Sequence, residues 1–130
     1  WNAPVDVRDH QGYAIRTALL MTVELSALNK ELKAEKLPAI NIGIGINTGR
    51  ALVGNMGSEQ RFDYSVIGDA VNLASRLESS SKTLGETIVI SENTVQGREH
   101  LYPFEFIDSI TVKGKSEPIK VYTIKTWQYK

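Results

Sequence analysis

One segment of the chain carries polar residues at the spacing that places side chains on a single helix face. The set recurs at intervals of three and four and consists of Asp69, Asn72, Arg76 and Ser79. Asn72 is unusual inside a helix, because its amide competes for backbone hydrogen bonds. With the Arg76 guanidinium one turn away, it forms a set of donors that could bind an anionic group. A solvated helix face explains the same spacing, and charge pattern alone favours that explanation.

A lysine pair lies further along the chain, at residues 113–115 (KGK). A glycine flanked by lysines is typical of a tight, solvated hairpin turn, and the same backbone can also form an anion-binding corner. Residue types alone favour the hairpin. His10 and His100 lack the spacing of metal ligands, so both are interpreted as surface residues. No pair of carboxylates shows the spacing of a metal site or of an acid–base pair.

The composition is that of one globular domain and excludes several classes of protein. Hydrophobic residues make up 42% of the 130 residues and charged residues 23%, which argues against disorder. Lys and Arg together number 15, as do Asp and Glu, so the net charge is zero. That balance disfavours a nucleic-acid-binding or membrane-surface protein, because both need a positive excess. The lack of cysteine excludes disulfide scaffolds, thiolate zinc sites and thiol catalysis.

The chain shows no sequence signal for a membrane span or for secretion. No apolar run approaches the roughly 20 residues that cross a bilayer, and no signal-peptide pattern is present. We therefore expect a cytoplasmic domain. The chain begins with Trp1 rather than methionine, so we also expect it to be a piece of a longer protein.

Two patterns predict the elements that precede the polar segment. An apolar stripe at helical spacing predicts a long helix: Ala14, Ala18, Met21, Leu25, Leu28 and Leu32. Asp9 is its expected N-cap, and Pro38 lies beyond its end. The alternation of Ile with Asn or Gly over residues 40–46 then predicts a strand with one nearly bare face. A helix could pack closely on that face, or another backbone or a flat ligand could approach it. Residues 47–50 have turn chemistry, which predicts a hairpin with residues 51–54.

The rest of the chain continues the alternation of strands and helices. Strands are expected over about residues 64–67, 87–90, 104–112 and 119–125. A helix over 69–82 is ended by Gly85, and a helical turn follows Ser91. This order predicts an α+β fold of ferredoxin-like character, with a mostly antiparallel sheet and its helices on one face. No repeat or linker divides the chain, so residues 1–130 are expected to form a single domain.

Three segments occur in the order and spacing of a known family: residues 43–49 (GIGINTG), 53–58 (VGNMGS) and 64–78 (YSVIGDAVNLASRLE). Together they resemble the catalytic domain of class III adenylate and guanylate cyclases of bacterial type. The resemblance runs from Trp1 to about Ile124. It implies a ferredoxin-like core, a homodimer with nucleotide sites at its interface, and a parent protein with sensor or membrane domains. It also implies two-metal chemistry with Mg²⁺ or Mn²⁺, in which the ribose 3′-oxygen of ATP attacks the α-phosphate and releases pyrophosphate.

The resemblance assigns roles to four residues. Asn72 matches the asparagine that orients the ribose, and Arg76 matches the arginine that stabilises charge on the α-phosphate. Lys113 matches a lysine that contacts the triphosphate. Ser65 stands at the position that reads the purine, where adenylate cyclases usually carry Asp or Thr. These matches make anion binding the favoured interpretation of the helix face with Asn72 and Arg76.

The chain also departs from the family pattern. In similar cyclases both metal-binding aspartates precede a segment like residues 1–4 (WNAP), and neither Asp63 nor Asp69 stands at a metal position. We therefore expect the chain to be the C-terminal two thirds of the domain, to bind no metal by itself and to be inactive alone.

The main hypothesis is an adenylate cyclase that acts on ATP. The alternatives are a guanylate cyclase that acts on GTP, and a non-catalytic cyclase-like module that regulates or dimerises. An RNA-binding domain is disfavoured by the balanced charge, and a diguanylate cyclase by the lack of its acidic glycine-rich turn.

Overall fold

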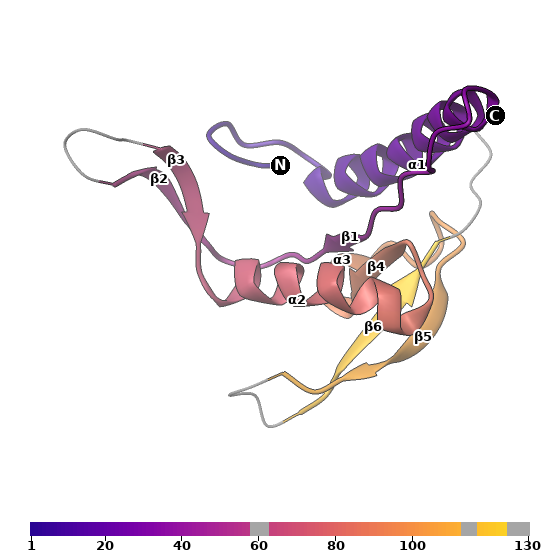
Figure 1. The fold of residues 1–130 in the computed structure, drawn as a ribbon. Coiled ribbons are helices and arrows are strands. Elements are labelled where there is room, and N and C mark those ends of the chain that lie inside the picture. The colour runs from indigo at the N-terminus through magenta and orange to yellow at the C-terminus, as the bar shows by residue number, and fades with distance from the viewer. Residues whose placement is uncertain (58–62, 113–116, 125–130) are drawn as a thin grey trace.

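The computed structural model describes residues 1–57, 63–112 and 117–124. Within these ranges the chain alternates between helices and strands (Figure 1). In chain order the elements are α1 His10–Ala34, β1 Ile44–Ile46, β2 Leu52–Met56, β3 Asp63–Ile67, α2 Asp69–Leu84, β4 Ile88–Ser91, α3 Glu92–Val95, β5 Glu105–Ile110 and β6 Ile119–Thr123.

Four of the strands form one sheet in the order β1-β4-β6-β5. β1 pairs in parallel with β4, with Gly45 opposite Val89, whereas β4 with β6 and β5 with β6 are antiparallel. A parallel pair needs a crossover connection, which here consists of β2, β3 and α2. A mostly antiparallel sheet combined with helices confirms the α+β fold class expected from the order of elements.

The two long helices cover opposite faces of this sheet. Alternate side chains of a strand point to opposite sides, so Ile88 and Ile90 of β4 pack with Ile15 of α1. Val89 lies between them and packs with Leu77 of α2. The expectation that the helices lie on one face is therefore wrong. Three consecutive buried apolar residues in β4 need cover on both sides, which one layer of helices cannot give.

β1 does not form a hairpin with β2, contrary to the expectation from the turn chemistry of residues 47–50. β2 pairs instead with β3, antiparallel, in a separate two-stranded sheet. The side chain of Asn47 bonds to Ser91 and to the backbone of Ala70, so the chain leaves the sheet toward α2 rather than turning back. The β2–β3 hairpin extends away from the rest of the molecule (Figure 1).

Only the first half of α1 is buried. Asp9 caps the helix, as predicted, by accepting a hydrogen bond from the Gly12 amide at 3.3 Å. Ala14 and Ala18 of the predicted stripe are buried, but Met21 and Leu28 are 47% and 41% exposed. A helix of 25 residues is about 37 Å long, which exceeds the reach of the short strands beside it. No helix within the described ranges is both long and apolar enough to cross a membrane.

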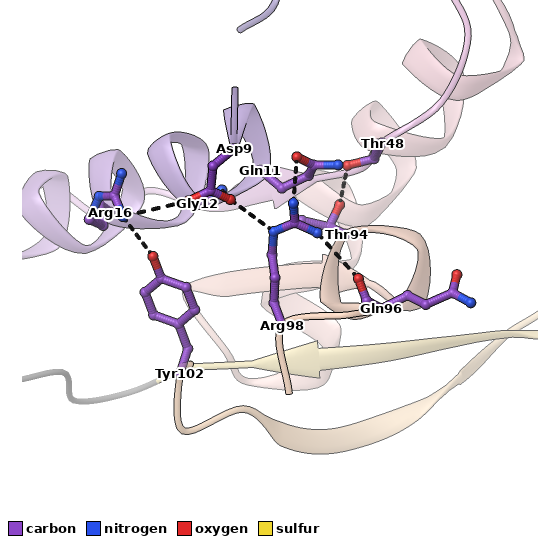
Figure 2. A network of polar contacts seen from close by, with 9 residues as sticks. All are labelled: Asp9, Gln11, Gly12, Arg16, Thr48, Thr94, Gln96, Arg98 and Tyr102. Carbon is purple, nitrogen blue, oxygen red and sulfur yellow. Dashed lines mark hydrogen bonds and ion pairs between the residues drawn. The ribbon is translucent and has the colours of Figure 1, made fainter. Parts of the chain in front are cut away.

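A network of polar contacts joins the start of α1 to the segment after α3 (Figure 2). Arg98 donates hydrogen bonds to Asp9 Oδ1 at 3.1 Å and to Gln11 Oε1 at 2.9 Å. Arg16 donates to the Tyr102 hydroxyl at 2.9 Å. These contacts span more than 80 residues of sequence and hold the first turns of α1 against the end of the sheet.

Candidate functional site

Helix α2 separates its buried residues from its polar ones, as the spacing predicted. Leu73 and Leu77 are 3% and 0% exposed and pack on the sheet. Asn72 and Arg76 are exposed and lie one turn apart. Neither of these two side chains has a hydrogen-bond or ion-pair partner among the described residues. An amide and a guanidinium placed in this way are available to bind an anion.

Arg76 borders an open hollow of about 360 Å³. Its other lining residues are Ser79, Ser80, Thr83, Leu84 and Ile110. One cation and three hydroxyl groups line the hollow, but two of the hydroxyls already donate to backbone carbonyl oxygens of α2, Ser79 to Ser75 at 3.1 Å and Ser80 to Arg76 at 2.7 Å. The Arg76 guanidinium therefore offers the main donors to an anionic ligand here. Lys113 follows Ile110 by three residues but lies outside the described residues, so the structure does not place it.

Two glycines allow α2 to lie close against β1. A Cβ on Gly45 would overlap the Ala74 carbonyl oxygen and the Glu78 amide nitrogen. A Cβ on Gly43 would overlap the Ser81 hydroxyl. Of the two explanations for the bare strand face, the structure supports close packing of a helix. The backbone of α2 therefore lies directly on the backbone of β1, which fixes the distance of the helix from the sheet.

The first turn of α2 is held by the residues that follow β1. Asn47 Nδ2 donates to the Ala70 carbonyl oxygen at 2.9 Å, and Ser91 Oγ donates to Asn47 Oδ1 at 2.6 Å. Gly68 precedes the helix with a φ of 144°, a backbone conformation that favours glycine. These hydrogen bonds of Asn47 were not predicted from the sequence. An asparagine directly after a buried strand is the only local indication of them, and that pattern also fits a turn.

Ser65 lies on a different element from Asn72 and Arg76. It is half-buried on β3, opposite Gly54 of β2. Gly68 is the single residue between β3 and α2. The placement of Ser65 relative to the α2 face therefore depends on the backbone conformation of Gly68. The roles assigned to these three residues and to Lys113 stay predictions.

The described residues contain no cluster of three or more metal-binding side chains. Within the described ranges, no group of three or more His, Asp or Glu side chains is arranged to hold a metal ion. The described residues therefore show no such cluster for the Mg²⁺ or Mn²⁺ that the family resemblance implies, and metal binding stays a prediction.

Comparison with known proteins establishes the family. The sequence model of the adenylate and guanylate cyclase catalytic domain matches residues 3–126. The chain belongs to this cyclase family. Adenylate cyclase 1 of Rhizobium meliloti (strain 1021) is 36% identical over 124 residues, which are 95% of this chain and 19% of that protein. The cyclase chain thus spans about a fifth of the length of this relative.

Solved cyclase structures share the fold. The adenylyl cyclase CyaB from P. aeruginosa has a TM-score of 0.82 and 32% identity, covering 97% of this chain and 65% of that one. The guanylyl cyclase Cya2 has a TM-score of 0.76 and 32% identity, covering 94% of this chain and 61% of that one. The cyclase chain spans less than two thirds of each structure. Because an adenylyl and a guanylyl cyclase resemble it to a similar degree, the fold does not determine the nucleotide.

Proposed function

We propose that this cyclase chain is the C-terminal two thirds of a catalytic domain that converts ATP to cyclic AMP and pyrophosphate. The observation that carries the proposal is the exposed face of α2, where Asn72 and Arg76 lie one turn apart without a partner among the described residues. A long cation and an amide that have no hydrogen bond or ion pair with the described residues contribute little to the stability of the fold. In a nucleotide cyclase chain they are suited to binding a triphosphate substrate.

In this mechanism Arg76 and Asn72 act on different parts of the substrate. The reaction forms a bond from the ribose 3′-oxygen to the α-phosphorus and breaks the bond from that phosphorus to the oxygen that leaves with pyrophosphate. The 3′-hydroxyl gives up its proton to water, so that ATP yields cyclic AMP, pyrophosphate and one proton. Negative charge on the α-phosphate oxygens is stabilised by hydrogen bonds from the Arg76 guanidinium. Asn72 orients the ribose so that the 3′-oxygen is in line with the bond that breaks.

Further substrate contacts would come from other elements. The Ser65 hydroxyl contacts the purine, and the Lys113 ammonium contacts the triphosphate. Mg²⁺ or Mn²⁺ would need ligands from outside the described ranges to complete a site of three or more metal-binding side chains.

The proposed enzyme is a homodimer in which Asn72 and Arg76 serve a nucleotide site that the other subunit completes. Exposed apolar side chains on the β2–β3 hairpin support this proposal, because such side chains are typical of surfaces that another chain covers: Leu52, Val66 and Ile67.

A guanylate cyclase is the second candidate, and the similarity to the guanylyl cyclase Cya2 supports it. A serine hydroxyl both donates and accepts hydrogen bonds. Ser65 is therefore compatible with the 6-amino group of adenine and with the 6-oxo group of guanine.

The proposal is tested by assaying the parent protein and this 130-residue chain side by side, with ATP or GTP and with Mg²⁺ or Mn²⁺. We expect the parent to form cyclic AMP and pyrophosphate in equal amounts. The chain alone should form no cyclic nucleotide above a protein-free blank. Steady product from the chain alone would show that it contains a complete site. A folded parent that dimerises but forms no product would favour the non-catalytic module, and faster turnover of GTP would favour the guanylate cyclase.

A further inference from the structure

The side chain of Asn47 joins three elements of the fold. It follows the last residue of β1, accepts a hydrogen bond from Ser91 at the end of β4 (2.6 Å) and donates one to Ala70 in α2 (2.9 Å). A carbonyl oxygen only accepts hydrogen bonds, so the amide nitrogen of Asn47 must face Ala70 and its oxygen must face the Ser91 hydroxyl. Ser91 is 0% exposed and Asn47 is half-buried, so water competes little for these bonds.

The residues around Asn47 are themselves anchored. Thr48 Oγ1 lies 2.8 Å from Thr94 Oγ1 (Figure 2), and Thr94 is 0% exposed. Ser91 Oγ lies 3.5 Å from the same Thr94 hydroxyl. Two consecutive residues after β1 are therefore tied to the junction of β4 and α3. This makes Asn47 a fixed support for α2.

Ala70 is the point at which this support reaches α2. It is the second residue of the helix, and Asn72 and Arg76 follow it by two and six residues. Because a helix is stiff over such a distance, a rotation or shift of its first turn moves both side chains. The close approach at Gly45 sets how far the helix lies from the sheet. The bond from Asn47 is directional, so it sets where the helix begins and how it is rotated about its axis.

We propose that Asn47 is a positioning residue for the cyclase reaction, which places Asn72 and Arg76 against the nucleotide by holding the Ala70 carbonyl oxygen. This inference rests on the function proposed for the α2 face. Asn47 has no contact with substrate in this assignment and acts through the helix. A small misplacement of Arg76 weakens its bonds to the transition state more than the binding of ATP.

The decisive variant is Asn47→Asp. It keeps an oxygen acceptor for Ser91 but places a second acceptor against the Ala70 carbonyl oxygen, so the bond to α2 is lost. Thr48→Val is the matched control, because it removes a neighbouring hydrogen bond of the same network, the one to Thr94, and leaves the bond from Asn47 to α2 in place. In the parent protein we expect Asn47→Asp to lower kcat by up to about 100-fold with little change in KM. Thr48→Val should lower kcat far less.

A double-mutant cycle separates positioning from a general loss of stability. In an Arg76→Ala background, Asn47→Asp should have a smaller effect on kcat, because one of the two groups that it places is already gone. If the fold-decreases in kcat caused by the two single substitutions simply multiply in the double variant, the inference is wrong. If Asn47→Asp does not fold, Asn47→Ala carries the same expectations, since it removes the bond without adding a repulsive charge.

Hydrogen exchange gives a readout that does not depend on activity. Backbone amides of residues 68–77 should exchange faster in Asn47→Asp than in the unmodified protein or in Thr48→Val, because the first turn of α2 has lost its anchor. Unchanged exchange in this segment would overturn the inference. An unmodified parent without cyclase activity would instead overturn the proposed function, and exchange would then decide alone whether Asn47 positions α2.

Discussion

Helix α2 and the β2–β3 hairpin are adjacent in sequence but differ in what supports them. α2 buries Leu73 and Leu77, lies directly on the backbone of β1 and is anchored through Asn47. The hairpin forms a two-stranded sheet of its own and leaves Leu52 and Ile67 63% and 50% exposed. A two-stranded hairpin alone is marginally stable in water. Within the described residues, α2 is therefore better supported than the hairpin, which leaves large apolar side chains exposed.

This difference separates two parts of the proposed reaction. Asn72 and Arg76, which would act on the reacting atoms, lie on the well-supported helix. Ser65, which would read the purine, lies on the weakly supported hairpin. Reaction rate should then respond to changes in the packing of α2, and nucleotide preference should respond to changes in the hairpin.

The largest expected effect is that of Arg76→Ala in the parent protein. The variant should lower kcat by about 100- to 1,000-fold, because it removes a donor to charge that develops in the transition state. KM for ATP should rise much less. Lys82→Ala is the control, because Lys82 is an exposed cation on the same helix that does not border the hollow at Arg76. Steady-state kinetics of both variants checks the prediction, and a change confined to KM would remove Arg76 from the reacting centre.

A smaller effect, on the free energy of unfolding, is expected when a glycine is replaced by alanine in each of the two regions in turn. Gly45→Ala should lower the free energy of unfolding by about 1–3 kcal/mol, because its Cβ would overlap backbone atoms of α2 that cannot move independently. Gly54→Ala in the hairpin should lower it by less than about 0.5 kcal/mol, because no atom lies within 4 Å of the added Cβ. Chemical denaturation of the chain and both variants makes the measurement. Equal losses in the free energy of unfolding at Gly45 and Gly54 would show that α2 and the hairpin do not differ in how tightly they are packed.

The features that could be predicted from the sequence are those that local patterns encode. The period of two around Gly43 and Gly45 predicted both a strand and a bare face, and the structure explains that face by the close approach of α2. Polar residues at intervals of three and four correctly predicted the exposed side of α2. Asp9 and Gly85 marked one end each of α1 and α2 through the geometry of helix caps.

The features that could not be predicted depend on partners distant in sequence. Nothing in residues 44–46 indicates that β1 pairs with β4 rather than β2, since both pairings bury the same isoleucines. The stripe on α1 predicted which face is apolar, but not how far the sheet extends beneath it. The run from Ile88 to Ile90 did carry a usable signal, because a strand without alternation needs cover on both faces. The anchor at Asn47 depends on Ser91, 44 residues away, which no local pattern reveals.

The smallest expected effect is a change in nucleotide preference at Ser65. A purine contact is present both in the bound substrate and in the transition state, so Ser65→Ala in the parent protein should leave kcat nearly unchanged. A neutral hydrogen bond contributes at most about 1.5 kcal/mol, so the ratio of kcat/KM for ATP to that for GTP should change by up to about 12-fold, a limit reached if Ser65 bonds to one purine alone. Ser109→Ala on β5 is the control, since Ser109 is exposed and lies on neither region. Because a hydroxyl both donates and accepts, the unmodified protein should discriminate measurably but incompletely against GTP. Kinetics with both nucleotides checks the ratio. An unchanged ratio in Ser65→Ala would assign purine recognition to other residues and would leave the hairpin without a direct role in substrate choice.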